Sequence, residues 1–139
     1  MLTKAIEENI GAVENLDYKT KMTNIDVEAD IEVQIPDRKF REIWSFACNG
    51  YRVEMQQMNA DQKETFRKRR RYTAKIINLP PNTIDQQLEG ELLPHHMKYW
   101  KVYKVNDECI EALVLFQSEK DKKMATIKKV RINQKEYEW

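Results

Sequence analysis

The sequence predicts an α+β protein built from two small modules, and three patterns carry that prediction. Apolar residues alternate with polar ones from Ile25 to Ile35, which is the period of a half-buried strand. A continuous apolar run at residues 112–116 indicates a second buried strand. Helical segments such as residues 84–92 lie between strand-like ones, so both element types alternate along the chain.

Composition places the chain among globular proteins. Its 139 residues suffice for one ordinary domain or two small ones, and they are 41% hydrophobic and 34% charged. No apolar run approaches the roughly 18 residues that a membrane helix needs, so no membrane partner is expected. The two cysteines, Cys48 and Cys109, are isolated, and the first residues lack an apolar signal core. We therefore expect an intracellular protein, in the nucleus or the cytoplasm.

The net charge of +1 hides an asymmetry between the two halves. Residues 1–66 hold 8 Lys and Arg against 13 Asp and Glu, a net charge of −5. Residues 67–139 hold 16 against 10, a net charge of +6. This change of sign suggests that only the second half meets a polyanion, and we expect any nucleic-acid affinity to lie there. The predicted organisation is a first module at 1–58, a basic linker at 59–71 and a second module at 72–139.

The second module has the clearer order of elements. Ser118 is a good helix N-cap, and Asn106-Asp107 is a turn pair. The order βαββαβ that results is the ferredoxin-like arrangement. The expected elements are strands at 73–79, 98–105 and 109–117, helices at 84–92 and 118–127, and a closing hairpin at 130–132 and 136–139.

The first module shows the same order without its first strand. Asn49-Gly50 is the strongest turn signal in the chain and precedes an alternating strand. We expect αββαβ, with a three-stranded sheet and one strand position left for another segment. The expected elements are helices at 2–9 and 37–47 and strands at 13–18, 25–35 and 51–55.

Residues 73–88 carry a family resemblance. A short apolar strand ends in Asn78-Leu79, two prolines and Asn82-Thr83 turn the chain, and a helix follows that Thr83 or Asp85 is able to cap. This segment resembles the opening of an RNA-recognition motif (RRM), and the resemblance covers about residues 72–139. It implies binding of single-stranded RNA on a four-stranded sheet, where bases stack on aromatic residues of two signature segments.

The residues at the signature positions depart from the RRM pattern. When the first segment is aligned through Asn78-Leu79, the position where an RRM has an aromatic residue is occupied by Lys75. When the second segment is aligned through Phe116, its two aromatic positions are occupied by Glu111 and Leu113. Its glycine position is occupied by Ile110. The three expected stacking aromatics are therefore absent.

Alternation along the strands offers other side chains for the ligand face. If Trp100 points inward, Tyr99, Lys101 and Tyr103 point outward, and Lys75 joins them from the first strand. Two tyrosines beside two lysines are able to stack bases and meet phosphates. The alternative is that these tyrosines cover a sheet edge, or that the register is reversed.

The cation run Arg67-Lys68-Arg69-Arg70-Arg71, followed by Tyr72, has three interpretations. It is a backbone-contacting linker with a stacking tyrosine, a solvated helix end, or a nuclear-import signal. Six further cations at residues 120–131 lie on and after the last helix, where a solvated surface is expected. The acidic row of the first module repels phosphates; it is interpreted as a solvated face or as a docking face for a basic partner, including this arginine run. That row consists of Asp26, Glu28, Asp30 and Glu32.

No enzyme, metal or cofactor is predicted. His95-His96 has no third ligand at metal spacing, and no phosphate-binding loop or nucleophile motif is present in the sequence. The predicted function is binding of single-stranded RNA or another nucleic acid by the linker and the second-module sheet. The alternatives are a degenerate RRM that contacts a protein partner, favoured by outward Leu113 and Leu115, and an unrelated role on the same fold. The predicted RNA-binding residues are Arg67, Lys68, Arg69, Arg70, Arg71, Tyr72, Lys75, Tyr99, Lys101 and Tyr103.

Overall fold

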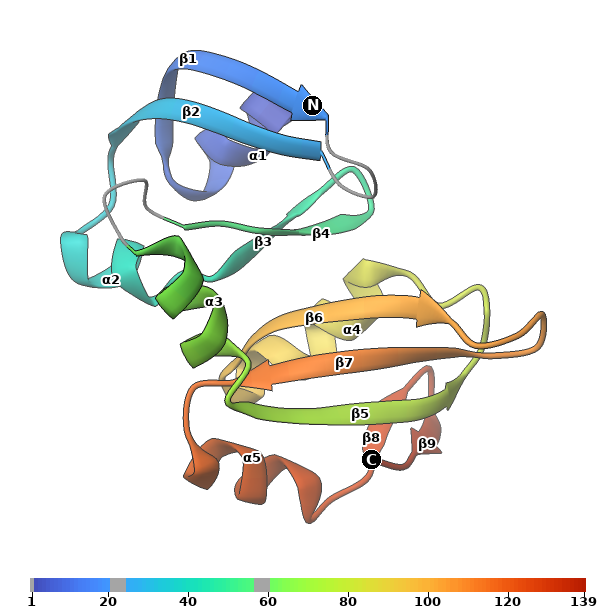
Figure 1. Ribbon diagram of the computed structural model, residues 1–139. Coiled ribbons are helices and arrows are strands. Elements are labelled where there is room, and N and C mark those ends of the chain that lie inside the picture. Colours follow the sequence, from blue (N-terminus) through green and yellow to red (C-terminus); the bar gives the residue numbers. More distant parts are fainter. Residues whose placement is uncertain (1, 21–24, 57–60) are drawn as a thin grey trace.

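The computed structural model describes residues 2–20, 25–56 and 61–139, and these form helices and small antiparallel sheets (Figure 1). The α+β class is therefore confirmed. The predicted boundaries at residues 58 and 59 lie outside the described residues. The elements of the first half are α1 (Leu2–Asn9), β1 (Gly11–Thr20), β2 (Ile25–Val33), α2 (Asp37–Glu42), β3 (Ser45–Cys48) and β4 (Tyr51–Glu54).

The first half consists of two hairpins and two helices. Strand β1 pairs with β2, and β3 pairs with β4, as two separate two-stranded sheets. The predicted three-stranded sheet is wrong. The small core that holds these pieces together contains Ile6, Ile10 and Phe46. Gly11 lets β1 approach β2, because a Cβ atom there would lie 1.9 Å from the carbonyl oxygen of Glu32.

The predicted helix at 37–47 is too long. Helix α2 ends at Glu42, and strand β3 begins at Ser45, still within the predicted helix. Phe46 is buried while Ala47 is exposed, so side chains alternate between two faces as in a strand. The reason is the predicted turn at Asn49-Gly50, where both residues have positive φ (49° and 81°) and close a tight hairpin with β4.

The second half contains a three-stranded antiparallel sheet in the order β5-β7-β6. A separate hairpin of β8 and β9 follows, so the predicted fourth strand is not part of this sheet. The chain just after β9 contacts β5, because the Ile77 backbone N–H donates to the Glu138 carbonyl at 3.1 Å. The elements are α3 (Gln62–Arg69), β5 (Tyr72–Leu79), α4 (Asp85–Leu92), the 3-10 turn η1 (Leu93–His95), β6 (Met97–Lys104), β7 (Ile110–Phe116), α5 (Glu119–Thr126), β8 (Val130–Ile132) and β9 (Lys135–Tyr137).

One face of this sheet forms the main core. Ile76 of β5, Trp100 of β6 and Val114 of β7 are fully buried on it and pack with Leu88 of α4. Ala125 of α5 packs against the same cluster, so both helices cover this inner face. The opposite face, called the outer face below, is turned away from the helices. Ala112, Val114 and Phe116 of β7 are buried on the inner face, and they alternate with Leu113 and Leu115, which were predicted to point outward.

The two predicted helix caps of the second half have different outcomes. Ser118 accepts a hydrogen bond from the Asp121 backbone at 3.1 Å, as predicted. Neither Thr83 nor Asp85 caps α4: the N-cap residue is Ile84, whose backbone N–H donates to the Gln87 side chain. Asp85 is the first helical residue, and it is buried. Within the described ranges, no helix is both long enough and apolar enough to cross a membrane.

Candidate nucleic-acid interface

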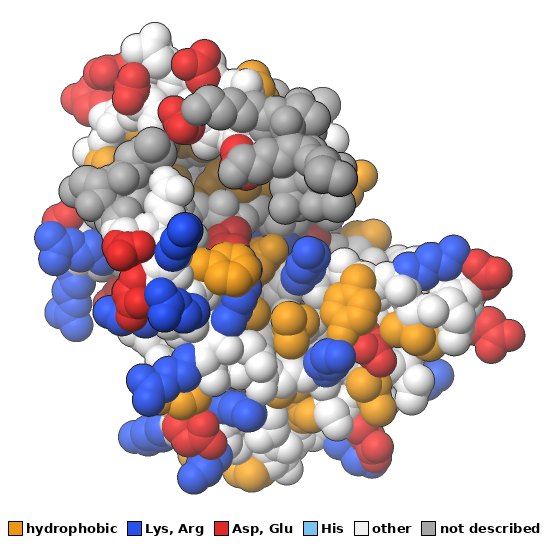
Figure 2. Space-filling model, in the orientation of Figure 1, with side chains coloured by type: hydrophobic (Ala, Val, Ile, Leu, Met, Phe, Trp, Pro, Cys, Tyr) orange, Lys and Arg blue, Asp and Glu red, His pale blue; other side chains and the backbone are white. Residues whose placement is uncertain are grey.

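The outer face of the β5-β7-β6 sheet brings several predicted site residues together. Alternation along three paired strands places Lys75, Lys101 and Leu113 in one row, since Lys75 and Lys101 both pair with Leu113. Tyr103 pairs with Glu111 in the next row. Basic and hydrophobic side chains are interspersed over this sheet in Figure 2. The predicted outward orientation of these residues agrees with the register.

Lys75, Tyr103 and Glu111 form a polar cluster at the open end of the outer face. The Tyr103 hydroxyl donates to the Glu111 carboxylate at 2.8 Å, and the Lys75 ammonium lies 3.9 Å from that carboxylate. The ammonium also lies 5.6 Å from the centroid of the Tyr103 ring. The pKa of Lys75 is raised, first by hydrogen bonding with Tyr103 and then by the charges of Tyr103 and Glu111. Lys75 therefore stays cationic. The cluster presents a lysine beside a ring whose position is fixed.

The other end of the outer face is covered by protein. Leu115 was predicted to point outward, and its pairing with Thr73 and Tyr99 places all three residues on the outer face. Leu115 is nevertheless only 1% exposed, so other parts of the chain cover it. Burial raises the pKa of Tyr99, and the charge of Glu54 adds to that rise while Arg70 opposes it. The Arg70 guanidinium lies 6.0 Å from the Tyr99 ring. Tyr99 is therefore half-buried, and Arg70 approaches its ring.

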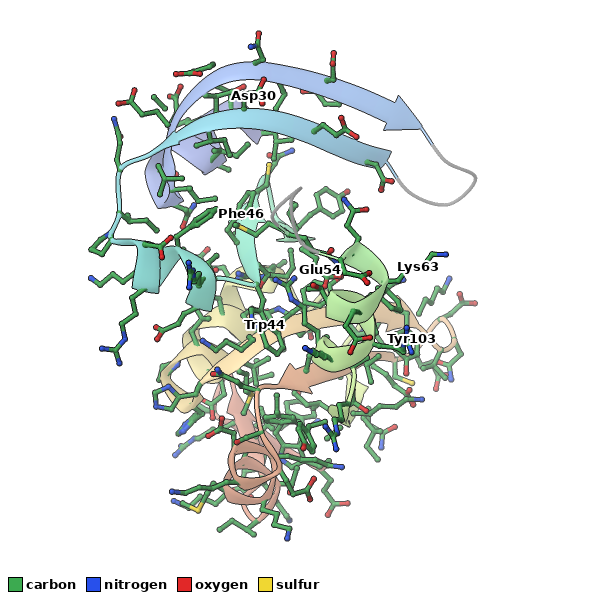
Figure 3. All side chains as sticks on the ribbon, turned by 60° about the vertical axis from the view of Figure 1, so that its left-hand side comes forward. Asp30, Trp44, Phe46, Glu54, Lys63 and Tyr103 are labelled. Atoms are coloured by element: carbon green, nitrogen blue, oxygen red, sulfur yellow. The ribbon has the colours of Figure 1, made fainter. Side chains whose placement is uncertain are left out.

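Two of the five linker cations bind Glu54 of β4. Arg70 donates to the Glu54 carboxylate at 2.8 Å, and Arg69 donates to it at 3.1 Å. Arg69 is buried, donates to the Met55 carbonyl at 2.6 Å and lies over the Trp44 ring. Burial lowers the pKa of Arg69, and the hydrogen bond and charge of Glu54 oppose that shift. Figure 3 shows Glu54, at the end of β4, beside helix α3.

The remaining linker residues lie in different surroundings. Arg67 is exposed and lies 3.5 Å from Glu64 in its own helix, and Lys68 is also exposed. Arg71 is exposed, and its guanidinium lies 5.6 Å from the Tyr72 ring. Tyr72 itself packs against the main core, on the inner side of the sheet. The structure thus separates Tyr72 from the outer face, and its stacking beside the linker stays a prediction.

A buried ion pair between the two halves was not predicted. Arg52 of β4 donates to Asp85 of α4 at 2.9 Å, and their side chains are 5% and 7% exposed. Arg52 also pairs with Glu89, and its guanidinium lies 4.0 Å above the Trp100 ring. The Trp100 indole N–H donates to Asp85 at 2.8 Å. We call Arg52, Asp85, Glu89 and Trp100 the Arg52 cluster.

Two further contacts join the halves beside the Arg52 cluster. The Ser45 hydroxyl donates to the Lys98 carbonyl at 2.7 Å, and the Lys98 ammonium donates to the Glu42 carbonyl at 3.0 Å. Both lie at the start of edge strand β6. No local sequence pattern marks these contacts, because their partners are separated by 53 and 56 residues.

The acidic row of the first half lies on the β1–β2 hairpin. Asp30 points away from the core in Figure 3 and accepts a hydrogen bond from Asn15 at 3.3 Å. Asp26, Glu28, Asp30 and Glu32 are all exposed. Arg69 and Arg70 bind Glu54 instead of this row, so the row does not dock these two arginines.

The outer face can contact a ligand through the charges of its lysines, the aromatic ring of Tyr103 and the aliphatic side chain of Leu113. In the described ranges, no group of three or more His, Cys, Asp or Glu side chains is arranged to hold a metal ion. His95 and His96 are exposed around η1, where His96 has a positive φ of 62°.

Searches of protein-family models, of curated proteins and of solved structures found no match to this chain.

Proposed function

We propose that this chain binds single-stranded RNA on the open end of the outer face of its second-half sheet. The observation that carries this proposal is the grouping of Lys75, Lys101 and Tyr103 on one open surface. The half-buried Tyr103 ring offers a face on which a base can stack, and two flanking ammonium groups attract the phosphates on either side of it. Leu113 between the lysines adds an aliphatic contact for the sugar or base.

The topology supports a divergent RRM as the fold behind this function. The strand order β5-β7-β6, with antiparallel pairing and both helices on the inner face, agrees with three of the four strands of a ferredoxin-like βαββαβ sheet. The hairpin β8–β9 takes the place in sequence of the fourth strand. In this proposal the first half is a cover for one end of the sheet, not a second RRM.

The proposed binding is weak and depends strongly on salt. One ring supplies about 1–3 kcal/mol of stacking, and each lysine that meets a phosphate releases about 0.7 counterion from a single strand. Glu111 offsets part of the charge of Lys75. We therefore expect little discrimination between base sequences.

Replacing both Lys75 and Lys101 with Gln is expected to lower the log–log salt slope of oligonucleotide binding by about 1.4. Both lysines are exposed, so their loss removes counterion release without disturbing the core. The measurement is fluorescence anisotropy of a labelled uridine-rich RNA at several salt concentrations. The same double change at exposed Lys4 and Lys39 of the first half is the control and should leave the slope unchanged. Equal slopes for the two double variants would contradict the proposed surface.

Replacing Tyr103 with Ala is expected to weaken binding of the single strand by about 1–3 kcal/mol while the salt slope stays the same. The ring is lost but no charge that meets phosphate is removed. Tyr103→Phe keeps the ring and loses only the hydroxyl bond to Glu111, so it should bind almost as well as the original chain. An RNA duplex serves as the second probe and should be insensitive to both changes. Equal losses from the Ala and Phe variants would assign the effect to the hydroxyl and not to stacking.

Protein–protein contact is the second candidate function, and the covered end of the outer face favours it. At Tyr99 and Leu115, other parts of the same chain already pack on this sheet. Leu113, in the next row of the same face, is half-buried and extends the apolar surface. If both double-lysine variants and both Tyr103 variants bind RNA as the original chain does, this candidate replaces RNA binding.

A further inference from the structure

A hollow of about 440 Å³ lies on the helix side of the second half, between the end of α4 and α5. Its volume is within the range of sites that enclose a small ligand or a peptide side chain. The deepest wall residues, Leu92 and Met97, belong to the main core. The apolar lining residues are Leu92, Pro94, Met97, Met124, Ala125, Val130 and Trp139. We call this hollow the α4–α5 groove.

The wall of the α4–α5 groove at Trp139 is fixed by two contacts. The Trp139 ring lies 5.8 Å from the Phe116 ring, measured between centroids. Its indole N–H donates to the Lys128 carbonyl at 2.9 Å. Because both the ring and its polar atom are engaged, Trp139 forms part of a preformed wall and does not need to rearrange for a ligand to enter.

Apolar side chains continue from the groove onto the surface. Met124 is 63% exposed and Ile127 is 71% exposed, on α5 and at its end, and Leu93 on the opposite side is 45% exposed. Adjoining exposed apolar residues around a hollow mark contact sites more often than isolated ones do. The rim therefore suits a ligand that buries apolar surface.

The surroundings of the groove are positively charged. Residues 118–131 hold six Lys and Arg against two Asp and Glu, a net charge of +4. Lys128 and Lys129 line the groove directly, together with Glu91 and Asp121. The Glu91 carboxylate accepts a hydrogen bond from the Arg131 backbone at 3.4 Å, and Lys129 lies 3.8 Å from Glu138. When Glu91 and Glu138 are counted with residues 118–131, six cations face four carboxylates, and the remaining excess of two positive charges attracts an anionic partner.

We infer that the α4–α5 groove binds a short acidic peptide segment that inserts one apolar side chain. The apolar walls require an apolar anchor, and the lysines around them select carboxylates on either side of that anchor. A nucleic acid fits these features less well, because the Trp139 ring that lines the hollow already packs against Phe116 and the other apolar lining residues are aliphatic. The groove lies on the opposite side of the sheet from Lys75, Lys101 and Tyr103, so this inference does not rest on RNA binding.

The test uses the full chain labelled with ¹⁵N and five peptides of the form Ser-Glu-Asp-X-Glu-Asp-Ser, where X is Leu, Ile, Phe, Met or Trp. At least one peptide should shift the amide signals of residues 92–97 and 124–130, with a dissociation constant of roughly 10–500 µM. The control peptide with X as Ser should bind at least about tenfold more weakly. The inference is overturned if none of the five binds, if the Ser peptide binds equally, or if the shifts lie on β5, β6 and β7.

Two surface variants assign the binding to the groove. Met124→Glu adds a negative charge at an exposed lining residue and should weaken the best peptide at least tenfold. Tyr18→Glu, the same type of change at a residue that is 62% exposed in the first half, should leave binding unchanged. Equal effects of the two variants would overturn the assignment. A single-stranded RNA that shifts residues 124–130 when no peptide does would replace the peptide with nucleic acid as the occupant.

Discussion

Replacing Arg52 with Ala is expected to lower the free energy of unfolding by about 3–5 kcal/mol, the typical loss when one partner of a buried ion pair is removed. Arg52 and Asp85 are 5% and 7% exposed at their side chains, so the Asp85 carboxylate would stay buried with only the Trp100 indole as a partner. In a chain of this size the midpoint of thermal unfolding should fall by roughly 10–20 °C. Circular dichroism with urea and temperature as the denaturing variables measures both quantities.

Two further variants separate the charge effect from lost packing. Arg52→Ala combined with Asp85→Asn removes the isolated charge but keeps an acceptor for Trp100, so this double variant should be more stable than Arg52→Ala alone. Arg41→Ala breaks an ion pair with Asp37 at 3.0 Å whose side chains are 72% and 71% exposed, and it should lose only about 0.3–0.5 kcal/mol. A loss from Arg52→Ala no larger than that of Arg41→Ala would show that the Arg52 cluster contributes little.

Replacing Glu54 with Gln is expected to destabilise the chain by about 2–3 kcal/mol and, at the same time, to strengthen RNA binding. Glu54 is the shared partner of Arg69 and Arg70. Arg69 would stay held by the Met55 carbonyl, but Arg70, whose side chain is 25% exposed beside Tyr99, would be released toward the outer face. One added phosphate contact raises the salt slope by about 0.7 and the affinity by roughly fivefold at about 0.1 M salt.

The matched control for this prediction is Glu8→Gln. It removes the same charge from the first half, where Glu8 lies 4.0 Å from Lys4 and is 63% exposed, so neither stability nor affinity should change measurably. Anisotropy and urea unfolding are measured on both variants. An affinity that falls together with stability in Glu54→Gln would mean that the Glu54 contacts hold α3 in a position that binding requires.

The elements that the sequence predicts well are those determined by neighbouring residues. The Asn49-Gly50 turn, the Ser118 cap and the inward row of β7 each depend on side chains within a few positions, and all three are present. Phe46 shows the limit of this reasoning. Its spacing from neighbouring apolar residues fits a helix as well as a strand, and pairing with Val53 of β4 decides for the strand.

The candidate site was predictable only where it depends on strand alternation. Lys75, Lys101 and Tyr103 share a face because adjacent strands are paired in register, which alternation anticipates. The ion pairs of Arg69 and Arg70 could not be predicted from the sequence. Their partner Glu54 lies 15 residues before Arg69, and no local pattern marks it as a partner. Asp85 looked like a helix cap, since an Asp at a helix start usually caps, but Arg52, 33 residues away, takes its carboxylate.

The Arg52 cluster also bears on how such a chain can be divided or recombined. A fragment that ends before α4 keeps Arg52 without Asp85, and one that begins after β4 keeps a carboxylate beside Trp100 without its guanidinium. Joining either half to an unrelated domain therefore requires a compensating substitution at position 52 or 85.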